Sequence, residues 1–322
     1  FIFFFYFHDS IQIYTFNFDN DANTGDKYDG GNDTDKASFV NLDASSLLSL
    51  EMKVDLAAGT VEVNPGDVAQ LVNFENVDGS QFRDVILGGS GVNIIDGQMG
   101  DDALIGRGGN DMLMGGGGQD DLFGDDGNDK LFGGANNDRL FGWTGEDELF
   151  GDDGNDVLFG QGGDDRLFGW VGEDQLEGDD GNDELFGQAD NDILFGWTGE
   201  DSLFGDDGDD QLFGQQDTDL LLGWEGNDTL VGGAGNDIMD GQGGADTYIF
   251  DLADMNAGGL DIILAYDAAD TYLIKGNPGQ NISYHTFNGS ASIDVNLAGG
   301  GVFTVDVLGS NIPNLQASVA FF

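Results

Sequence analysis

The chain has 322 residues with 56 glycines, no cysteine, and 62 Asp and Glu against 9 Lys and Arg, a formal net charge of −53. This charge excludes nucleic acid as a partner, because phosphate binding needs a basic surface, and it argues against attraction to anionic membranes. The lack of cysteine excludes disulfides and thiolate metal sites, and no apolar run is long enough for a transmembrane helix. Because 39% of the residues are hydrophobic, we expect a folded chain that takes up cations to offset its charge.

Residues 1–24 form the first expected segment, and its sequence FIFFFYFHDSIQIYTFNF predicts a two-stranded hairpin around His8, Asp9 and Ser10. The segment lacks the basic start and small-residue cleavage site of a signal peptide. An exposed aromatic hairpin of this kind would aggregate. We therefore expect it either to cover the open end of its own fold or to pair with another subunit, and both alternatives stay open.

Residues 25–78 carry a weaker version of the pattern that follows them. The stretch YDGGNDTDKASF at 28–39 is typical of a polar turn, and residues 54–63 and 69–80 read as strand pairs joined by turns. We interpret this segment as degenerate β-coils that precede a more regular array.

Residues 79–249 divide into nineteen consecutive blocks of nine residues without insertion or deletion. Position 1 is always Gly, position 6 is Asp except at Asn93, and position 8 is Ile, Leu or Met except at Tyr248. Position 4 is Gly except at Phe82, Asn136, Asp190 and Asp217. Because Gly, Asn and Asp tolerate positive φ best, positions 1–6 predict a turn and positions 7–9 a short strand with position 8 facing the core.

Strands of three residues are stable only when many of them stack into a solenoid. The consensus G-x-x-G-x-D-x-Leu-Phe resembles the RTX (repeats-in-toxin) nonapeptide, which binds calcium in a parallel β-helix. The resemblance implies an all-β fold, a right-handed parallel β-roll with two nonapeptides per coil and β-rich N- and C-terminal caps.

The resemblance also implies that calcium ions lie between successive coils, with each Asp at position 6 sharing an ion with the equivalent Asp two blocks later. Examples are Asp102 with Asp120, Asp111 with Asp129, Asp138 with Asp156 and Asp210 with Asp228. Backbone carbonyls would complete the oxygen shell that calcium prefers. The candidate ligands are Asp84, Asp102, Asp111, Asp120, Asp129, Asp138, Asp147, Asp156, Asp165, Asp174, Asp183, Asp192, Asp201, Asp210, Asp219, Asp228, Asp237 and Asp246. They would hold up to about 17 ions. The alternative is that these side chains only make hydrogen bonds within turns.

Residues 250–322 contain two alternating stretches, GGLDIILAYDAADTYLI and ASIDVNLAGGGVFTVDVLG, that predict strands. This segment resembles the C-terminal cap and uncleaved type I secretion signal of RTX proteins. The resemblance implies export to the outside of the cell or its surface, where millimolar calcium suits weak sites and where metal binding would drive folding.

Two sets of outward aromatic residues are candidate contact surfaces. Phe occupies position 9 in ten blocks, and strand stacking would align these residues into a row on each face, interrupted on one face by Glu177. Such rows either stabilise the sheet, mediate self-association or bind another surface. Trp143, Trp170, Trp197 and Trp224 recur at every third block, so they should alternate between the two edges of the roll. They are either repeated contacts or relics of duplication.

No motif for an enzyme is found: there is no H-E-x-x-H, no G-x-S-x-G and no G-x-x-x-x-G-K, and the two histidines are His8 and His285. We therefore expect a secreted, non-enzymatic, calcium-binding structural protein. It would form a homo-oligomer or filament through the Phe-rich faces and residues 1–18. The alternatives are an adhesin or surface-binding solenoid, and the secretion tail of a larger exported enzyme.

Overall fold

The computed structural model describes residues 12–15, 27–29, 35–38, 51–64, 67–72, 74–251, 260–264, 270–275, 282–287, 290–296, 302–308 and 319–321. Within these ranges every regular element is a β-strand, and the described residues include no helix that could span a membrane. The chain divides into two compact units, Phe1–Val157 and Leu158–Phe322.

The first unit contains β1 (Gln12–Thr15), β2 (Lys27–Asp29), β3 (Asp35–Ser38), β4 (Glu51–Asp55), β5 (Thr60–Asn64), β6 (Asp67–Val72), β7 (Asn76–Asp78), β8 (Arg83–Leu87), β9 (Ile94–Met99), β10 (Ala103–Gly108), β11 (Met112–Gly117), β12 (Asp121–Asp126), β13 (Lys130–Ala135), β14 (Arg139–Thr144) and β15 (Glu148–Asp153). Its strands form two sheets, in the orders β1-β3-β7-β9-β11-β13-β15 and β2-β6-β5-β4-β8-β10-β12-β14.

The second unit contains β17 (Arg166–Val171), β18 (Gln175–Asp180), β19 (Glu184–Ala189), β20 (Ile193–Thr198), β21 (Ser202–Asp207), β22 (Gln211–Gln216), β23 (Leu220–Glu225), β24 (Thr229–Ala234), β25 (Ile238–Asp240), β26 (Thr247–Asp251), β27 (Leu260–Ile263), β28 (Thr271–Lys275), β29 (Ile282–Phe287), β30 (Ser290–Asn296), β31 (Val302–Leu308) and β32 (Val319–Phe321). Strand β16 (Val157–Gly162) begins at the last residue of the first unit. The sheet orders are β17-β19-β21-β23-β25-β27-β31-β30-β29 and β18-β20-β22-β24-β26-β28-β32.

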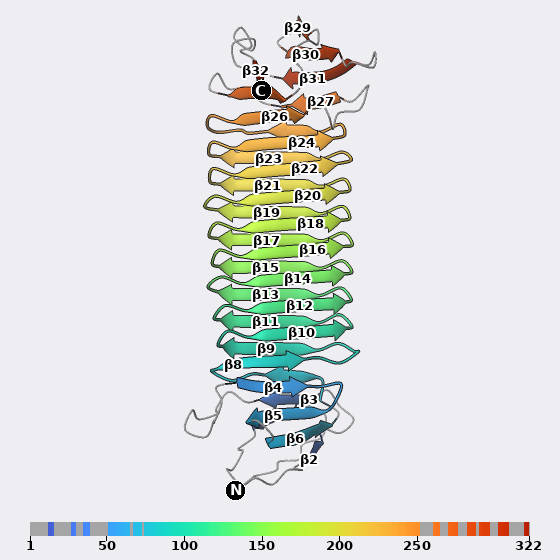
Figure 1. Ribbon diagram of the computed structural model, residues 1–322, viewed down its shortest axis with the longest axis vertical. Helices are drawn as coiled ribbons and strands as arrows, with labels where there is room; N and C mark the ends of the chain where they lie inside the picture. Colours follow the sequence, from blue (N-terminus) through green and yellow to red (C-terminus); the bar gives the residue numbers. More distant parts are fainter. Residues whose placement is uncertain are drawn as a thin grey trace. The chain divides into compact units, whose positions relative to one another are not determined.

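Each unit contains a parallel β-roll, and successive strands of its regular coils belong to different sheets. Neighbours within a sheet of the regular coils are parallel and two blocks apart in register, as in Leu122 with Leu140 and Leu203 with Leu221. Figure 1 shows β10, β12 and β14 running one way and β11, β13 and β15 the other. One coil therefore takes two nonapeptides, which confirms the prediction.

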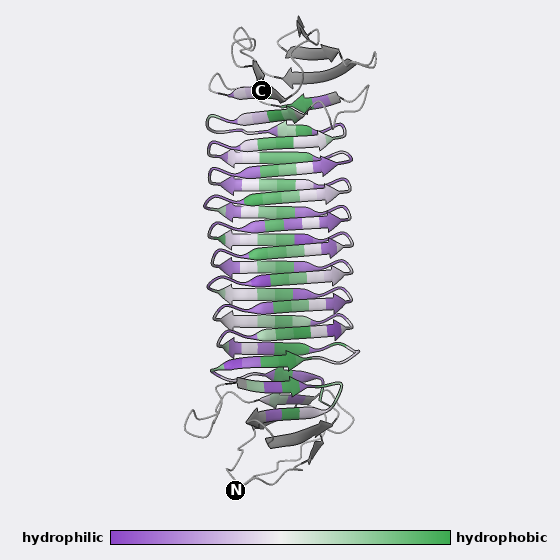
Figure 2. Ribbon diagram, viewed as in Figure 1, coloured by the Kyte–Doolittle hydropathy of each residue, from purple (hydrophilic) through white to green (hydrophobic). Residues whose placement is uncertain are grey.

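The core of each roll is a stack of the position-8 side chains. The leucines from Leu104 to Leu230 in this position are completely buried, and each contributes about 1.5–3 kcal/mol by leaving water. Figure 2 shows the apolar residues as a central band in the strands of the regular coils, with hydrophilic residues toward the turns. The complete burial of the leucines confirms that position 8 faces inward.

The strands are longer than the sequence pattern indicated. In the regular coils they have six residues, as in Asp121–Asp126, which is position 7 of one block to position 3 of the next. The expectation of a three-residue strand and a six-residue turn was therefore wrong. The backbone keeps pairing after position 1, as in Asp125 with Trp143, so the turn itself occupies positions 4–6.

Positive φ occurs at positions 2 and 4, whereas positions 1 and 4 were expected. At position 4, Asn136 (φ 79°), Asp190 (φ 76°) and Asp217 (φ 72°) replace Gly and keep its left-handed conformation. Position 1 needs Gly because of close packing: a Cβ atom on Gly97 would lie 2.4 Å from Oδ2 of Asp102 and 2.8 Å from the Gly115 carbonyl oxygen. Gly97 thus makes room for the oxygen atoms of the site.

The described ends of the chain depart from the regular coil. In the first unit β4, β5 and β6 form an antiparallel meander, and β4 continues into the roll by parallel pairing with β8. Of the expected hairpin at residues 1–18 the structure describes only β1, which pairs in parallel with β3 of the same chain. In the second unit β29, β30 and β31 are antiparallel, and β31 pairs in parallel with β27.

Candidate metal-binding turns

All eighteen predicted aspartates are at most 2% exposed, and all except Asp84, which lies inside β8, lie at the ends of turns. They enter the interior because position 6 immediately precedes the strand that carries the buried position 8. A carboxylate in such a place costs free energy unless it is hydrogen-bonded or paired with a positive charge.

One oxygen of these carboxylates is hydrogen-bonded to the preceding coil. The amide N–H of Asp102 donates to Oδ1 of Asp120 at 2.7 Å, and the N–H of Asp111 donates to Oδ1 of Asp129 at 2.7 Å. The same bond links Asp138 to Asp156 and Asp210 to Asp228. The structure therefore brings together all four pairs that served as examples, through a bond that sequence reasoning did not foresee.

The second oxygen is the unusual feature of the turns. It is buried and receives no hydrogen bond in Asp102, Asp111, Asp120, Asp129, Asp138, Asp183, Asp192, Asp201, Asp210, Asp219, Asp228 and Asp237. Buried polar groups without a partner are rare in folded proteins and call for an explanation. A row of them at a fixed spacing points to a partner other than a protein donor.

The surroundings of this oxygen suit a hard cation. Oδ2 of Asp111 and the carbonyl oxygen of Gly124 both lie within 2.9 Å of the place where a Cβ atom of Gly106 would be. A carboxylate oxygen that receives no hydrogen bond and a carbonyl oxygen thus crowd the same small space, and such oxygens are the ligands that calcium prefers. In the described part of the chain, no three acidic, His or Cys side chains are grouped as a metal site.

Burial also changes the proton affinity of the carboxylates. It raises the pKa of Asp102, Asp138 and Asp219 to about 8, from an ordinary value of 3.8, although the backbone N–H of the previous coil opposes the shift. The same cause raises the pKa of Asp129 and Asp210 to about 6. Without a cation, part of these carboxyl groups would therefore be protonated near neutral pH.

Position 5 carries a second row of hydrogen bonds that the sequence reading missed. Here the side chain accepts from the following coil: Oδ1 of Asn128 accepts the N–H of Glu146 at 3.2 Å, and Oδ1 of Asn182 accepts the N–H of Glu200 at 2.9 Å. The frequent Asn and Asp at position 5 were the feature of the sequence that could have indicated these hydrogen bonds. These side chains are exposed and their Oδ1 is engaged by the backbone.

The row of buried carboxylates continues past the nineteen blocks. The N–H of Asp237 donates to Oδ1 of Asp261, and that of Asp246 donates to Oδ1 of Asp270. Asp261 and Asp270 are buried, and so are Ile263 and Tyr272 two residues beyond them. An insertion shifts this coil out of the nine-residue frame, so the members of each pair are 24 residues apart. The sequence does carry a signal for Asp261 and Asp270: each begins a triplet Asp-x-apolar, and the two triplets are nine residues apart.

The expected Phe rows are present, and their rings stack on one another. The ring centroids of Phe123 and Phe141 are 5.0 Å apart, and those of Phe168 and Phe186 are 4.8 Å apart. In both pairs the ring planes are nearly parallel. The gap at Glu177 is also present, since Glu177 pairs with Phe195 in the register. Much of each ring is covered by its neighbours, and the structure thus supports a stabilising role for the rows.

The four tryptophans occupy position 2 with φ between 73° and 79° and are 39–46% exposed. In the second unit Trp170 and Trp224 lie in β17 and β23 of one sheet and Trp197 in β20 of the other, as their spacing of three blocks predicts. Indole Nε1 of Trp197 donates to Glu177 at 3.3 Å. Nothing in the structure explains why a bulky residue takes a left-handed position here.

Stacked coils of two nonapeptides each, with buried carboxylates at their turns, define the class of this protein as a parallel β-roll of repeated nonapeptides. The model of the RTX calcium-binding nonapeptide repeat matches residues 78–113, 114–149, 144–176, 171–203, 186–221, 198–230 and 213–248. These matches cover more than half of the chain, and the chain belongs to this family of calcium-binding repeats.

Comparison with solved structures finds similarity to the extracellular lipase LipA from Serratia marcescens. The sequence identity is 18%, the TM-score is 0.25, and the match covers 74% of this chain and 40% of the lipase chain. This chain thus corresponds to less than half the length of that protein. A search of curated proteins found no match to the sequence.

Proposed function

We propose that the turns of this protein bind a series of calcium ions and that the coils that carry these ions fold only when they are bound. The observation that carries the proposal is the buried Oδ2 atom without a donor, repeated at position 6 along the array. A bound cation would supply the missing partner and offset part of the charge of −53.

Each ion would take one carboxylate Oδ2 and the carbonyl oxygen of the position-1 glycine in the next coil, such as Asp111 with Gly124. Further carbonyls of the turns would complete a shell of six to eight oxygens. The candidate ligands remain the eighteen aspartates of the sequence analysis, with Asp261 and Asp270 as additions.

The family also supports an extracellular place of action. Calcium is scarce inside cells and millimolar outside, so sites with dissociation constants of about 10⁻⁴ to 10⁻³ M would fill after export. We therefore propose a type I secreted, non-catalytic protein whose repeat array is a structural domain. The described residues 260–264, 270–275, 282–287, 290–296, 302–308 and 319–321 would cap the array beside the proposed secretion signal.

The test is the number of calcium ions retained per chain after dialysis, measured by elemental analysis. Asp129→Asn is expected to lower this number by one or two, because it removes charge from a buried oxygen without a donor. Asp121→Asn is the matched control, since Asp121 lies on the sheet surface and pairs with Arg139. Equal retention by both variants and the original chain, or no retained calcium at all, would overturn the proposal.

Self-association through the Phe rows is a separate proposal. It rests on the repetition of partly exposed rings in the same place on successive coils. Sizing by light scattering in about 2 mM calcium should detect oligomers that Phe186→Ser combined with Phe204→Ser weakens. A monomer at every concentration tested would leave the rings with a stabilising role alone.

A further inference from the structure

The first coil of the array departs from the pattern at Asn93, which takes the place of Asp at position 6. Its Oδ1 accepts the N–H of Gly89 at 2.7 Å, and its Nδ2 donates to the carbonyl oxygen of Glu75 at 2.6 Å. Both ends of the amide are thus satisfied by protein atoms. This turn lacks the donor-free oxygen of the later turns.

The neighbour in the preceding coil explains why Asn is needed here. In later coils the atom facing the position-6 side chain is an N–H, which suits a carboxylate oxygen. At this point Glu75 presents a carbonyl oxygen instead. A carboxylate would repel this oxygen, whereas the amide of Asn93 donates to it.

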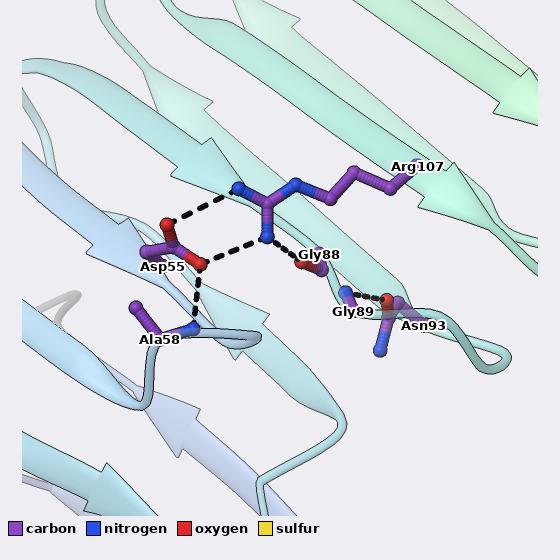
Figure 3. A network of polar contacts seen from close by, with 6 residues as sticks. All are labelled: Asp55, Ala58, Gly88, Gly89, Asn93 and Arg107. Atoms are coloured by element: carbon purple, nitrogen blue, oxygen red, sulfur yellow. Dashed lines mark hydrogen bonds and ion pairs between the residues drawn. The ribbon is translucent and has the colours of Figure 1, made fainter.

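A protein cation lies at the same turn (Figure 3). Nη1 of Arg107 donates to the carbonyl oxygen of Gly88 at 2.8 Å and to Oδ1 of Asp55 at 2.9 Å, and Nη2 donates to Oδ2 of Asp55 at 3.1 Å. Gly88 is the position-1 glycine of its block, the kind of residue whose carbonyl crowds the carboxylate oxygen in later coils. The guanidinium therefore places positive charge beside an equivalent carbonyl oxygen.

The same ion pair fastens the N-terminal meander to the roll. Oδ1 of Asp55 also accepts the N–H of Ala58 in the turn between β4 and β5. Arg107 is the main cause that lowers the pKa of Asp55, so the carboxylate stays charged. A two-pronged pair of this kind has a defined geometry.

The opposite edge of the first coil is also closed by protein donors. The N–H of Ser80 donates to Oδ2 of Asp84 at 2.5 Å, and its hydroxyl donates to Oδ1 at 3.0 Å. In the later turns described above, Oδ2 has no such donor. Serine at position 2 occurs in this block alone.

We infer that the first coil closes without metal, with Arg107 and Ser80 supplying the positive charge and donors that calcium supplies in later coils. The inference rests on the proposed calcium sites, because it states where their series begins. Strands β4, β8 and β9 then form a metal-independent end on which the calcium-dependent coils stack. The inference therefore removes Asp84 from the eighteen candidate ligands, because Asp84 would accept the hydrogen bonds of Ser80 instead.

The test is hydrogen–deuterium exchange of the full chain in chelator, followed by mass spectrometry. Peptides from 51–60 and 84–96 should stay protected while peptides from 118–240 exchange rapidly. Arg107→Ala should remove the protection of 51–60 and 84–96. Arg139→Ala is the matched control, because Arg139 forms a two-pronged pair with Asp121 on the exposed sheet surface.

The outcomes separate the two proposals. Equally fast exchange of 84–96 and 118–240 in chelator, or no effect of Arg107→Ala, overturns the inference and leaves the calcium sites standing. Persistent protection of 118–240 in chelator contradicts the calcium sites themselves. As a second measurement, Asp84→Asn should retain as many calcium ions as the original chain, and a loss like that of Asp129→Asn would overturn the inference.

Discussion

Chelation of calcium with EDTA is expected to abolish most of the β-sheet signal in far-ultraviolet circular dichroism. In the chelated protein, each coil would hold two buried carboxylates, and an unpaired buried charge costs several kcal/mol. Such a cost, repeated along the array, exceeds the net stability of an ordinary domain, which is about 5–15 kcal/mol. Leucine burial alone would not hold the coils together.

The recovery of the signal gives the control for this experiment. Excess calcium should restore it, whereas magnesium at the same concentration should not, because magnesium is smaller and keeps its water ligands. A spectrum that does not change on chelation would show that the roll is stable with its carboxylates unpaired by metal.

In the absence of calcium, protonation of the buried carboxylates at low pH is expected to supply part of the stability that calcium otherwise gives the roll. In the metal-free roll the pKa of Asp138, Asp192 and Asp219 is raised to about 8 by burial, while the unfolded chain has the ordinary value of 3.8. The folded state therefore binds more protons than the unfolded state between these values. Its stability is largest near the ordinary pKa and decreases as the pH rises toward about 8.

The measurement is the β-sheet signal of protein stripped of calcium beforehand, recorded at a series of pH values in dilute solution. The signal should be larger at the acid end and fall toward about pH 8. With millimolar calcium present, the signal should stay high at the alkaline end, because the ion takes the place of the proton. A signal in stripped protein that grows with rising pH would contradict the assignment of the buried carboxylates.

The repeat itself made the core and the main site predictable. Leu104 and its equivalents recur with period nine, and Asp102 and its equivalents recur two residues before them. Only a stack of identical coils places every such leucine inside and every such aspartate at a turn. The register of two blocks per coil then followed from the resemblance to the RTX nonapeptide.

Other features depend on contacts that a nine-residue pattern does not contain. The strand continues through position 2 because residues such as Asp125 accept positive φ and keep their pairing. Asn93 depends on the carbonyl of Glu75, and Arg107 on Asp55, which lies 52 residues away. Asp261 and Asp270 were missed because an insertion moved them out of phase.

A crystal structure grown in calcium, with an anomalous difference map, tests the central claim most directly. We expect a peak beside Oδ2 of Asp111, Asp129, Asp192 and Asp210, each also close to a glycine carbonyl of the next coil. Turns that contain only water beside these oxygens would contradict it.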